Sequence, residues 1–202
     1  MKILGLTGPS GAGKGTAAAI FAKYGIPSID TDAVYHGLLE KSADLTAELT
    51  DAFGKQILDD NGRVDRKKLG AIVFGQENTP SLLHTLNTIT HKYVMAKTHE
   101  MAQEHEKNGA RALLIDAPQL FEAHIEGECD LILGVLADRE TRKARIMARD
   151  GINEETAMRR INAQRPDDFY RGACHHILIN DGDLAALEAQ ILRFLENSDL
   201  GV

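Results

Sequence analysis

The stretch that decides the fold is Gly8-Pro9-Ser10-Gly11-Ala12-Gly13-Lys14-Gly15-Thr16, which directly follows the apolar run from Ile3 to Leu6. It has the form G-x-x-x-x-G-K, typical of a loop that binds phosphate between a strand and a helix. Glycines let the backbone coil closely around a phosphate, and successive amide N–H groups then point inward at the start of the helix. Lys14 adds a movable cation. A chance glycine-rich turn is the alternative, but strand, loop and helix stand in the order that nucleotide binding requires.

One position departs from this pattern. The residue after the lysine is usually Ser or Thr, whose hydroxyl ligates Mg²⁺, whereas here it is Gly15, followed by Thr16. The run Gly-Lys-Gly-Thr resembles the loop of adenylate-kinase-type enzymes, where the metal is held largely through water. We expect a requirement for magnesium and leave direct ligation by the loop open.

The composition bounds the class of protein. The chain has 202 residues, 43% of them hydrophobic, which predicts one domain, 1–202, with an inserted helical part. A net charge of −7 argues against a surface that wraps nucleic acid. Two cysteines, Cys129 and Cys174, fit a reducing compartment. The sequence shows no signal peptide and no apolar run near the ~20 residues of a membrane helix, so we expect a soluble, cytoplasmic protein.

Carboxylates follow two of the predicted strands. The second strand ends in Asp30-Thr31-Asp32 ahead of a helix over 33–40, and the third strand, 112–116, ends in Asp116. In a parallel α/β sheet the ligand crevice lies at the carboxyl ends of the strands, so these groups should face the loop. Asp32 could simply cap its helix, but a chemical role is favoured. Asp116 occupies the position of an aspartate that orients magnesium.

The stretch from 43 to 109 looks almost entirely helical, with a turn at Asp59-Asp60-Asn61-Gly62. A short amphipathic helix should begin near Arg66 and include Phe74, and Thr79-Pro80 should open a long helix. One buried stripe is expected on that long helix, formed by Leu82, Leu86, Ile89, Tyr93 and Ala96. His84 and His91 share a face, but with no third ligand in range we expect solvated or core histidines. The insertion, 33–109, would carry the acceptor substrate.

A basic segment follows the fourth strand, 131–137. Arg142, Arg145 and Arg149 fall at spacings of three and four, so they share one helix face, and Arg160 and Arg171 follow. A solvated basic face is the ordinary reading of such a run. Opposite a phosphate loop, arginines can instead close over a triphosphate. We favour this lid, residues 139–171, with Arg149 its principal arginine. A fifth strand, 176–180, and a helix capped by Asp183 complete the chain.

These residues carry a resemblance that spans nearly the whole chain. The sequence resembles dephospho-coenzyme A kinases, a family of P-loop kinases. The matching pieces are Leu6-Thr7-Gly8 with the loop, 25–32, Asp65-Arg66 to Phe74, His91, Asp116-Ala-Pro-Gln-Leu-Phe-Glu122, Arg149-Asp150, Gln164-x-Pro166, Arg171 and Ile179-Asn180. The segment 116–122 is the most diagnostic. Departures are Gly15 for the usual Ser, Lys92 for a Pro after His91, and Cys174-His175-His176 before the last strand.

The resemblance implies the site. Asp32 would be the catalytic base, with Lys14 and Arg149 stabilising the γ-phosphoryl group. ATP would be held by Gly11, Ala12, Gly13, Lys14, Gly15, Thr16 and Asn180; the acceptor by Asp32, His91, Pro118, Leu120 and Glu122; and Mg²⁺ by Thr16 and Asp116. The implied fold is a three-layer α/β P-loop kinase with a five-stranded parallel sheet.

The implied reaction is ATP-dependent phosphorylation of the ribose 3′-hydroxyl of dephospho-CoA, by an enzyme we expect to be monomeric. The alternative within the class is a kinase for nucleoside monophosphates or other small molecules. A GTP-dependent switch would need an Asn-Lys-x-Asp motif, which does not occur. A non-catalytic scaffold would leave Asp32 and Arg149 without a reason.

Overall fold

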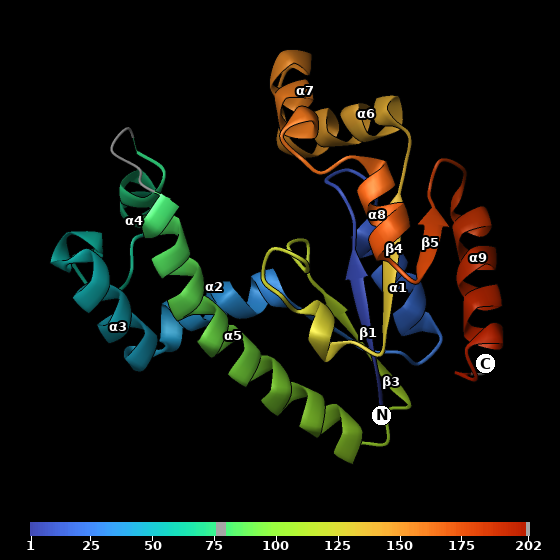
Figure 1. The fold of residues 1–202 in the computed structure, drawn as a ribbon, viewed down its shortest axis with the longest axis horizontal. Coiled ribbons are helices and arrows are strands. Elements are labelled where there is room, and N and C mark those ends of the chain that lie inside the picture. The colour runs from blue at the N-terminus through green and yellow to red at the C-terminus, as the bar shows by residue number, and fades with distance from the viewer. Residues whose placement is uncertain (76–79, 201–202) are drawn as a thin grey trace. The chain divides into compact units, whose positions relative to one another are not determined.

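The computed structural model describes residues 1–75 and 80–200. Its contacts divide the chain into two compact units. The sheet unit comprises residues 1–30 and 104–202, and the helical unit comprises Thr31–Gln103. The helical unit thus begins two residues before the predicted insertion, 33–109, and ends six residues before its predicted end. Figure 1 shows the elements of both units.

The sheet unit is built on five parallel strands (Figure 1), as the sequence predicts. In chain order they are β1 (Lys2–Thr7), β2 (Ser28–Asp30), β3 (Ala112–Asp116), β4 (Leu131–Leu136) and β5 (His176–Ile179). Their order across the sheet is β2-β3-β1-β4-β5, so β1 lies at the centre. Strands β4 and β5 each end one residue before the predicted boundary. Near-continuous apolar runs suit strands that are covered on both faces.

Two helices cover one face of the sheet. α1 (Lys14–Lys23) and α9 (Leu184–Asn197) pack on alternate residues of the central strands, such as Leu4 and Leu6 of β1. Phe21 of α1 meets Phe194 of α9 edge to face, with ring centroids 6.1 Å apart. These contacts form the main hydrophobic core, and burial of this apolar surface is the largest favourable term in folding the unit.

The opposite face carries glycines where helices and loops approach closely. A Cβ on Gly5 of β1 would lie 2.7 Å from Leu120 and 2.9 Å from the Sγ of Cys129. A Cβ on Gly134 of β4 would lie 3.0 Å from the Sγ of Cys174, which follows α8 (Asp167–Ala173). The sheet is therefore the middle of three layers. Between β3 and β4 the chain also forms a short 3₁₀ turn, η2 (Glu126–Glu128).

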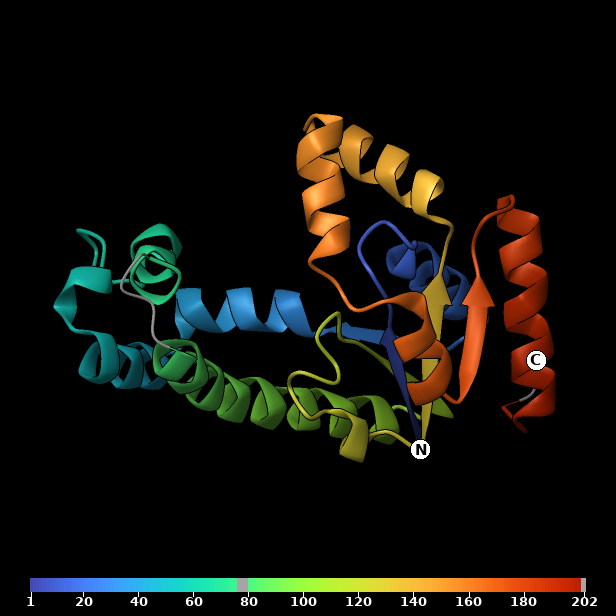
Figure 2. The same cartoon turned by 45° about the horizontal axis from the view of Figure 1, so that its top comes forward.

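A helical hairpin follows β4 and lies beyond the carboxyl ends of the strands (Figures 1 and 2). It consists of α6 (Arg139–Asp150) and α7 (Glu154–Asn162), joined at Gly151 in a left-handed conformation. Side chains of Asp138 and Asn153 cap the two N-termini by accepting hydrogen bonds from backbone N–H groups. Its small core contains Ile146, Ala157 and Ile161.

The helical unit has a separate core. Its elements are α2 (Thr31–Lys41), α3 (Ala43–Phe53), η1 (Lys55–Ile57), α4 (Arg66–Val73) and the first part of α5 (Pro80–Lys107). Ser42 and Asp65 cap α3 and α4. The predicted turn at 59–62 is confirmed, because Asp59 accepts hydrogen bonds from the backbone N–H groups of Asn61 and Arg63. The core of this unit is formed by Leu39, Leu45, Leu49, Phe53, Ile57, Val64, Leu69, Val73, Leu86 and Ile89.

Several local predictions are wrong in this unit. Phe74 follows α4 and is 66% exposed, so it does not belong to the buried face. On α5, Ala96 is exposed while Val94 and Met95 are buried, because the buried face shifts along this long helix. Helix α2 begins at Thr31, two residues early, which places Asp32 inside its first turn instead of at the cap. Thr79 lies outside the described residues. Within the described ranges, no helix is long and apolar enough to span a bilayer.

Candidate active site

The phosphate loop leads from β1 into α1 and has the backbone that its glycines permit. Gly11 and Gly13 have φ of +80° and +97°, values that side chains with a Cβ rarely adopt. Gly13 is also the N-cap of α1, so Lys14 is the first helical residue. The Lys14 Nζ donates a hydrogen bond of 3.0 Å to the carbonyl oxygen of Gly8. The lysine therefore folds back along the loop.

Three consecutive loop carbonyls are held from outside the loop. Arg142 Nε donates to the Ser10 oxygen at 3.1 Å, and one Arg145 nitrogen lies 3.4 Å from each of the next two carbonyl oxygens, those of Gly11 and Ala12. The buried Asn180 side chain also donates to the Ala12 oxygen, at 2.8 Å. The predicted nucleotide residue Asn180 thus directly supports the loop.

Two carboxylates, those of Asp30 and Asp116, lie at the carboxyl ends of neighbouring strands, the end of the sheet from which the phosphate loop leaves β1. Asp30 and Asp116 are paired in the register of β2 and β3, and Asp116 pairs with Leu6, one residue before the end of β1. The Asp116 side chain is half-buried, and Thr16 is exposed in the first turn of α1. Carboxylate and hydroxyl oxygens are hard donors of the kind that Mg²⁺ prefers, so this donor set fits that metal. Asp32 belongs to the helical unit, two residues along the chain from Asp30.

The segment after β3 is divided between core and surface. Leu120 is fully buried and packs under Gly5, whereas Pro118 is half-buried. Glu122 is exposed and forms an ion pair with Arg165, beyond α7. Leu120 thus has a packing role in the sheet unit, and the acceptor contacts of these three residues stay a prediction.

Arg149 lies at the end of α6 with an exposed side chain. Its guanidinium donates to both oxygens of Asp150, at 2.8 and 3.0 Å, and to the Ser10 Oγ at 3.3 Å. Asp150 also pairs with Arg160. The hydrogen bonds with Asp150 raise the pKa of Arg149, and those with Arg149 lower the pKa of the Asp150 carboxyl. The predicted lid arginine is charged and touches the loop.

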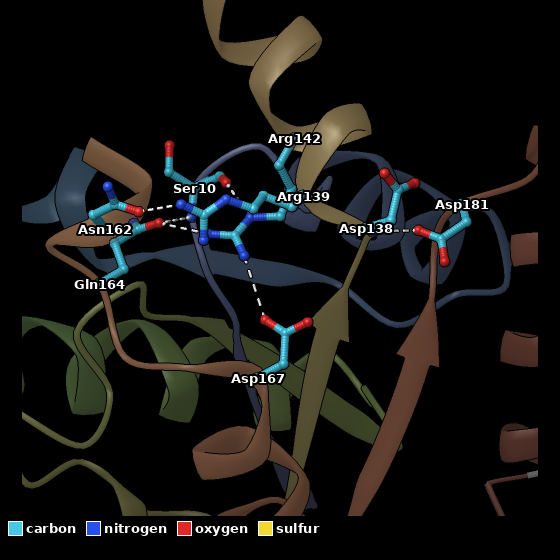
Figure 3. Close-up of polar contacts among 8 residues, drawn as sticks. All are labelled: Ser10, Asp138, Arg139, Arg142, Asn162, Gln164, Asp167 and Asp181. Carbon is cyan, nitrogen blue, oxygen red and sulfur yellow. Dashed lines mark hydrogen bonds and ion pairs between the residues drawn. The ribbon is translucent and has the colours of Figure 1, made fainter. Parts of the chain in front are cut away.

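Sequence reasoning named Arg142 and Gln164 but did not predict their contacts with the loop, nor the contact between Asp167 and Arg142. Arg142 is 5% exposed, and its guanidinium contacts Gln164 and Asp167 as well as Ser10 (Figure 3). The sequence contains one signal for its burial. Ile146 lies four residues after Arg142, so the two side chains share the helix face that packs inward. Gln164 lies in the irregular segment between α7 and α8, and Asp167 is the first residue of α8, so helical periodicity predicts neither contact.

The helical unit contains a pocket of about 830 Å³ between α2 and the turn that precedes α4. Its wall carries three cationic side chains, Arg63, Arg66 and Lys67, and an equal number of carboxylates, one of them from Glu40. His36 contributes a polar edge. The carboxylates of Asp59 and Asp65, also in the wall, accept hydrogen bonds from the backbone. His91 is half-buried on α5, with its Nε2 buried and without a hydrogen bond in the described structure. No described group of three His, Cys, Asp or Glu side chains, His84 and His91 included, forms a metal site.

The family model for dephospho-CoA kinase matches residues 2–186. A dephospho-CoA kinase of Latilactobacillus sakei is 36% identical over 96% of this chain and 94% of that protein, and one of Arabidopsis thaliana is 35% identical over 96% and 83%.

Solved structures agree. TT1252 from Thermus thermophilus has a TM-score of 0.79 and 31% identity, covering 97% of both chains. The dephospho-CoA kinase from Campylobacter jejuni has a TM-score of 0.61 at 24% identity, covering 97% of this chain and 96% of that one, which supports the fold alone. The resemblance and the P-loop kinase fold predicted from the sequence are thus confirmed. The chain belongs to the dephospho-CoA kinase family.

Proposed function

We propose that this chain transfers the γ-phosphoryl group of ATP to the ribose 3′-hydroxyl of dephospho-CoA. The observation that carries the proposal is the family match over residues 2–186, which includes the phosphate loop, the carboxylates at the strand ends and the basic hairpin. Phosphoryl transfer leaves little covalent work to the protein, so positioning and charge stabilisation supply most of the catalysis.

The sheet unit would hold the nucleotide. Loop residues 11–16, at the N-terminal end of α1, would point their amide groups at the phosphates. Lys14 would leave the Gly8 carbonyl and follow the charge that moves from the γ- to the β-phosphate. Arg149, exposed beside Ser10, would neutralise the transferred group. We place Asn180 near the adenine, where its side chain also fixes the loop.

The helical unit would hold the acceptor. Its pocket carries three cationic side chains, from Arg63, Arg66 and Lys67, which suit the diphosphate of dephospho-CoA. We assign Asp32 the role of base for the 3′-hydroxyl. His91 and, from the segment after β3, Pro118, Leu120 and Glu122 are the remaining proposed acceptor residues.

Magnesium would enter with ATP and neutralise charge on its phosphates. Asp116 and Thr16 are the proposed ligands, directly or through water. The space beside Gly15 is open, because a Cβ built there meets nothing within 4 Å. That space suits a water in the place of the missing hydroxyl. We further propose that the enzyme acts as a monomer, because one chain supplies every group named above. We place it in the cytoplasm, because both cysteines are free thiols, as is usual in a reducing compartment.

The test of the function is a product assay across an acceptor panel. Purified protein with MgATP should phosphorylate dephospho-CoA far faster than AMP, CMP or shikimate. Preferential turnover of a nucleoside monophosphate would overturn the proposal in favour of the alternative kinase activity.

The test of the roles compares two variants. Asp32→Asn keeps the shape but removes the base, so kcat should fall by on the order of 10²–10⁴ while ATP affinity, measured by calorimetry, changes little. Lys14→Ala should weaken ATP binding as well as turnover. Normal kcat in Asp32→Asn would move the base to Asp30 or Asp116, and loss of ATP binding would place Asp32 at the metal.

A further inference from the structure

Ser10 is held at every polar atom by residues of the hairpin and the segment after it. Figure 3 shows two of these residues, Arg142 and Gln164. Its N–H donates to the Gln164 Oε1 at 3.2 Å, and its carbonyl oxygen accepts from the Arg142 Nε at 3.1 Å. Its hydroxyl accepts from Arg149. The Gln164 Oε1 also accepts from an Arg142 terminal nitrogen at 2.9 Å. Ser10, Arg142 and Gln164 therefore form a closed ring of hydrogen bonds.

This ring determines where neighbouring amides point. In a trans peptide the C=O and N–H groups lie in one plane and point in opposite directions. Because Arg142 holds the Ser10 carbonyl toward α6, the N–H of Gly11 must point to the other side. Arg145 and Asn180 fix the N–H of Gly13 in the same way: they hold the Ala12 carbonyl, so the N–H of that peptide must point away from them. These are the N–H groups of the nest that would receive phosphate oxygens.

The ring also brings a buried positive charge to the loop. Arg142 is 5% exposed, and burial lowers the pKa of its guanidinium. Its carboxylate partner is Asp167, at 3.3 Å, whose side chain is 41% exposed and so is well screened by water. A buried guanidinium that keeps three hydrogen-bonded partners is well fixed, and its field adds to that of the loop for an anionic ligand.

We propose that Arg142 and Gln164 are positioning residues for the triphosphate. They hydrogen bond to the backbone of Ser10, so that the loop is already arranged for phosphate before ATP arrives. They also connect the loop to α6 and to the segment after α7. The proposal rests on the proposed kinase function, since it assigns the loop to ATP. Preorganisation of this kind lowers the cost of ordering on binding, and it acts on ATP affinity more than on the acceptor.

The test uses Arg142→Lys, which keeps the charge but cannot reach Ser10 and Gln164 together, and Gln164→Leu, which removes the shared acceptor. Each should weaken ATP binding about tenfold by calorimetry and raise the KM for ATP, while the KM for dephospho-CoA stays within about twofold. Gln164→Glu keeps the acceptor oxygen but sets a negative charge against Arg142, so it should bind ATP more tightly than Gln164→Leu and more weakly than the unaltered protein.

Arg139→Lys is the matched control. Arg139 lies one turn before Arg142 on α6 and hydrogen bonds to Asn162 of α7 (Figure 3). ATP affinity in this variant should stay within about twofold. Equal weakening in Arg139→Lys, or a parallel rise in the acceptor KM, would show that only the hairpin was loosened and would overturn the proposal. Unchanged ATP affinity in Arg142→Lys and Gln164→Leu would do the same.

Two further outcomes are informative. If Gln164→Leu fails to unfold cooperatively, Arg142→Lys decides: unchanged ATP affinity in that variant would contradict the role of the hydrogen-bonded ring. If the unaltered protein does not bind ATP at all, the proposed function fails instead, and the two failures are thereby distinguished.

Discussion

Gly13→Ala offers a sharp test of how the phosphate loop is built, because its cost follows from two independent features. Gly13 has φ of +97°, and an L-residue in that region costs about 1–2 kcal/mol. The new Cβ would lie 2.1 Å from the Nδ2 of Asn180. That side chain must leave the Ala12 carbonyl, and a buried polar group left unsatisfied costs about 1–3 kcal/mol. The sum is about 2–5 kcal/mol, a large part of ordinary domain stability.

Urea unfolding without nucleotide measures this cost, and a second substitution separates its parts. In an Asn180→Ala background the clash is gone, so Gly13→Ala should cost only the backbone strain, about 1–2 kcal/mol. Gly15→Ala is the control, because Gly15 has neither a positive φ nor a neighbour within 4 Å of its Cβ. It should be neutral or stabilise by up to about 1 kcal/mol. An equal cost of Gly13→Ala in both backgrounds would refute the role given to Asn180.

Three further predictions concern the metal, the core and the thiols. Gly15→Ser should keep kcat within about tenfold of that of the unaltered protein, a change in activation free energy of roughly 1.4 kcal/mol at most. Activity is measured across a magnesium titration, and much tighter magnesium dependence in the variant would show that the site had lacked a hydroxyl ligand. Leu120→Ala should cost about 2–5 kcal/mol in urea unfolding, because it empties fully buried space under Gly5; a cost below 1 kcal/mol would contradict a core role. Burial raises the pKa of Cys129 to about 12 and that of Cys174 to about 11. At pH 8 iodoacetamide should therefore label Cys129 on the order of 10³-fold and Cys174 on the order of 10²-fold more slowly in folded protein than in guanidinium, and rapid labelling of folded protein would contradict this.

The strands and the phosphate loop were predictable because each rests on local chemistry. An apolar run, a glycine-rich loop and a helix with Gly25 after it specify β1, the loop and α1 without tertiary information. Asp116 was predictable for the same reason, since it ends an apolar run of central-strand character.

The role of Arg142 was not predictable in this way. Arg142, Arg145 and Arg149 share one face by spacing, and the sequence does not say which of them tertiary packing will bury. The structure buries Arg142 and leaves Arg149 exposed. Gln164 meets Ser10 across 154 residues of sequence, a pairing for which no local pattern exists. The prediction for Phe74 is wrong for a related reason: α4 ends at Val73, so the side chain of Phe74 does not continue the apolar face of the helix.

The proposed reaction of this enzyme is phosphoryl transfer from ATP to the 3′-hydroxyl of dephospho-CoA. The most direct measurement is NMR of the product formed by purified protein, ATP, magnesium and dephospho-CoA, in which phosphorus–proton correlation locates the new phosphate ester. We expect one new phosphomonoester coupled to the ribose H3′, formed together with ADP. A phosphate on any other atom, or ATP hydrolysis without a phosphorylated acceptor, would contradict it.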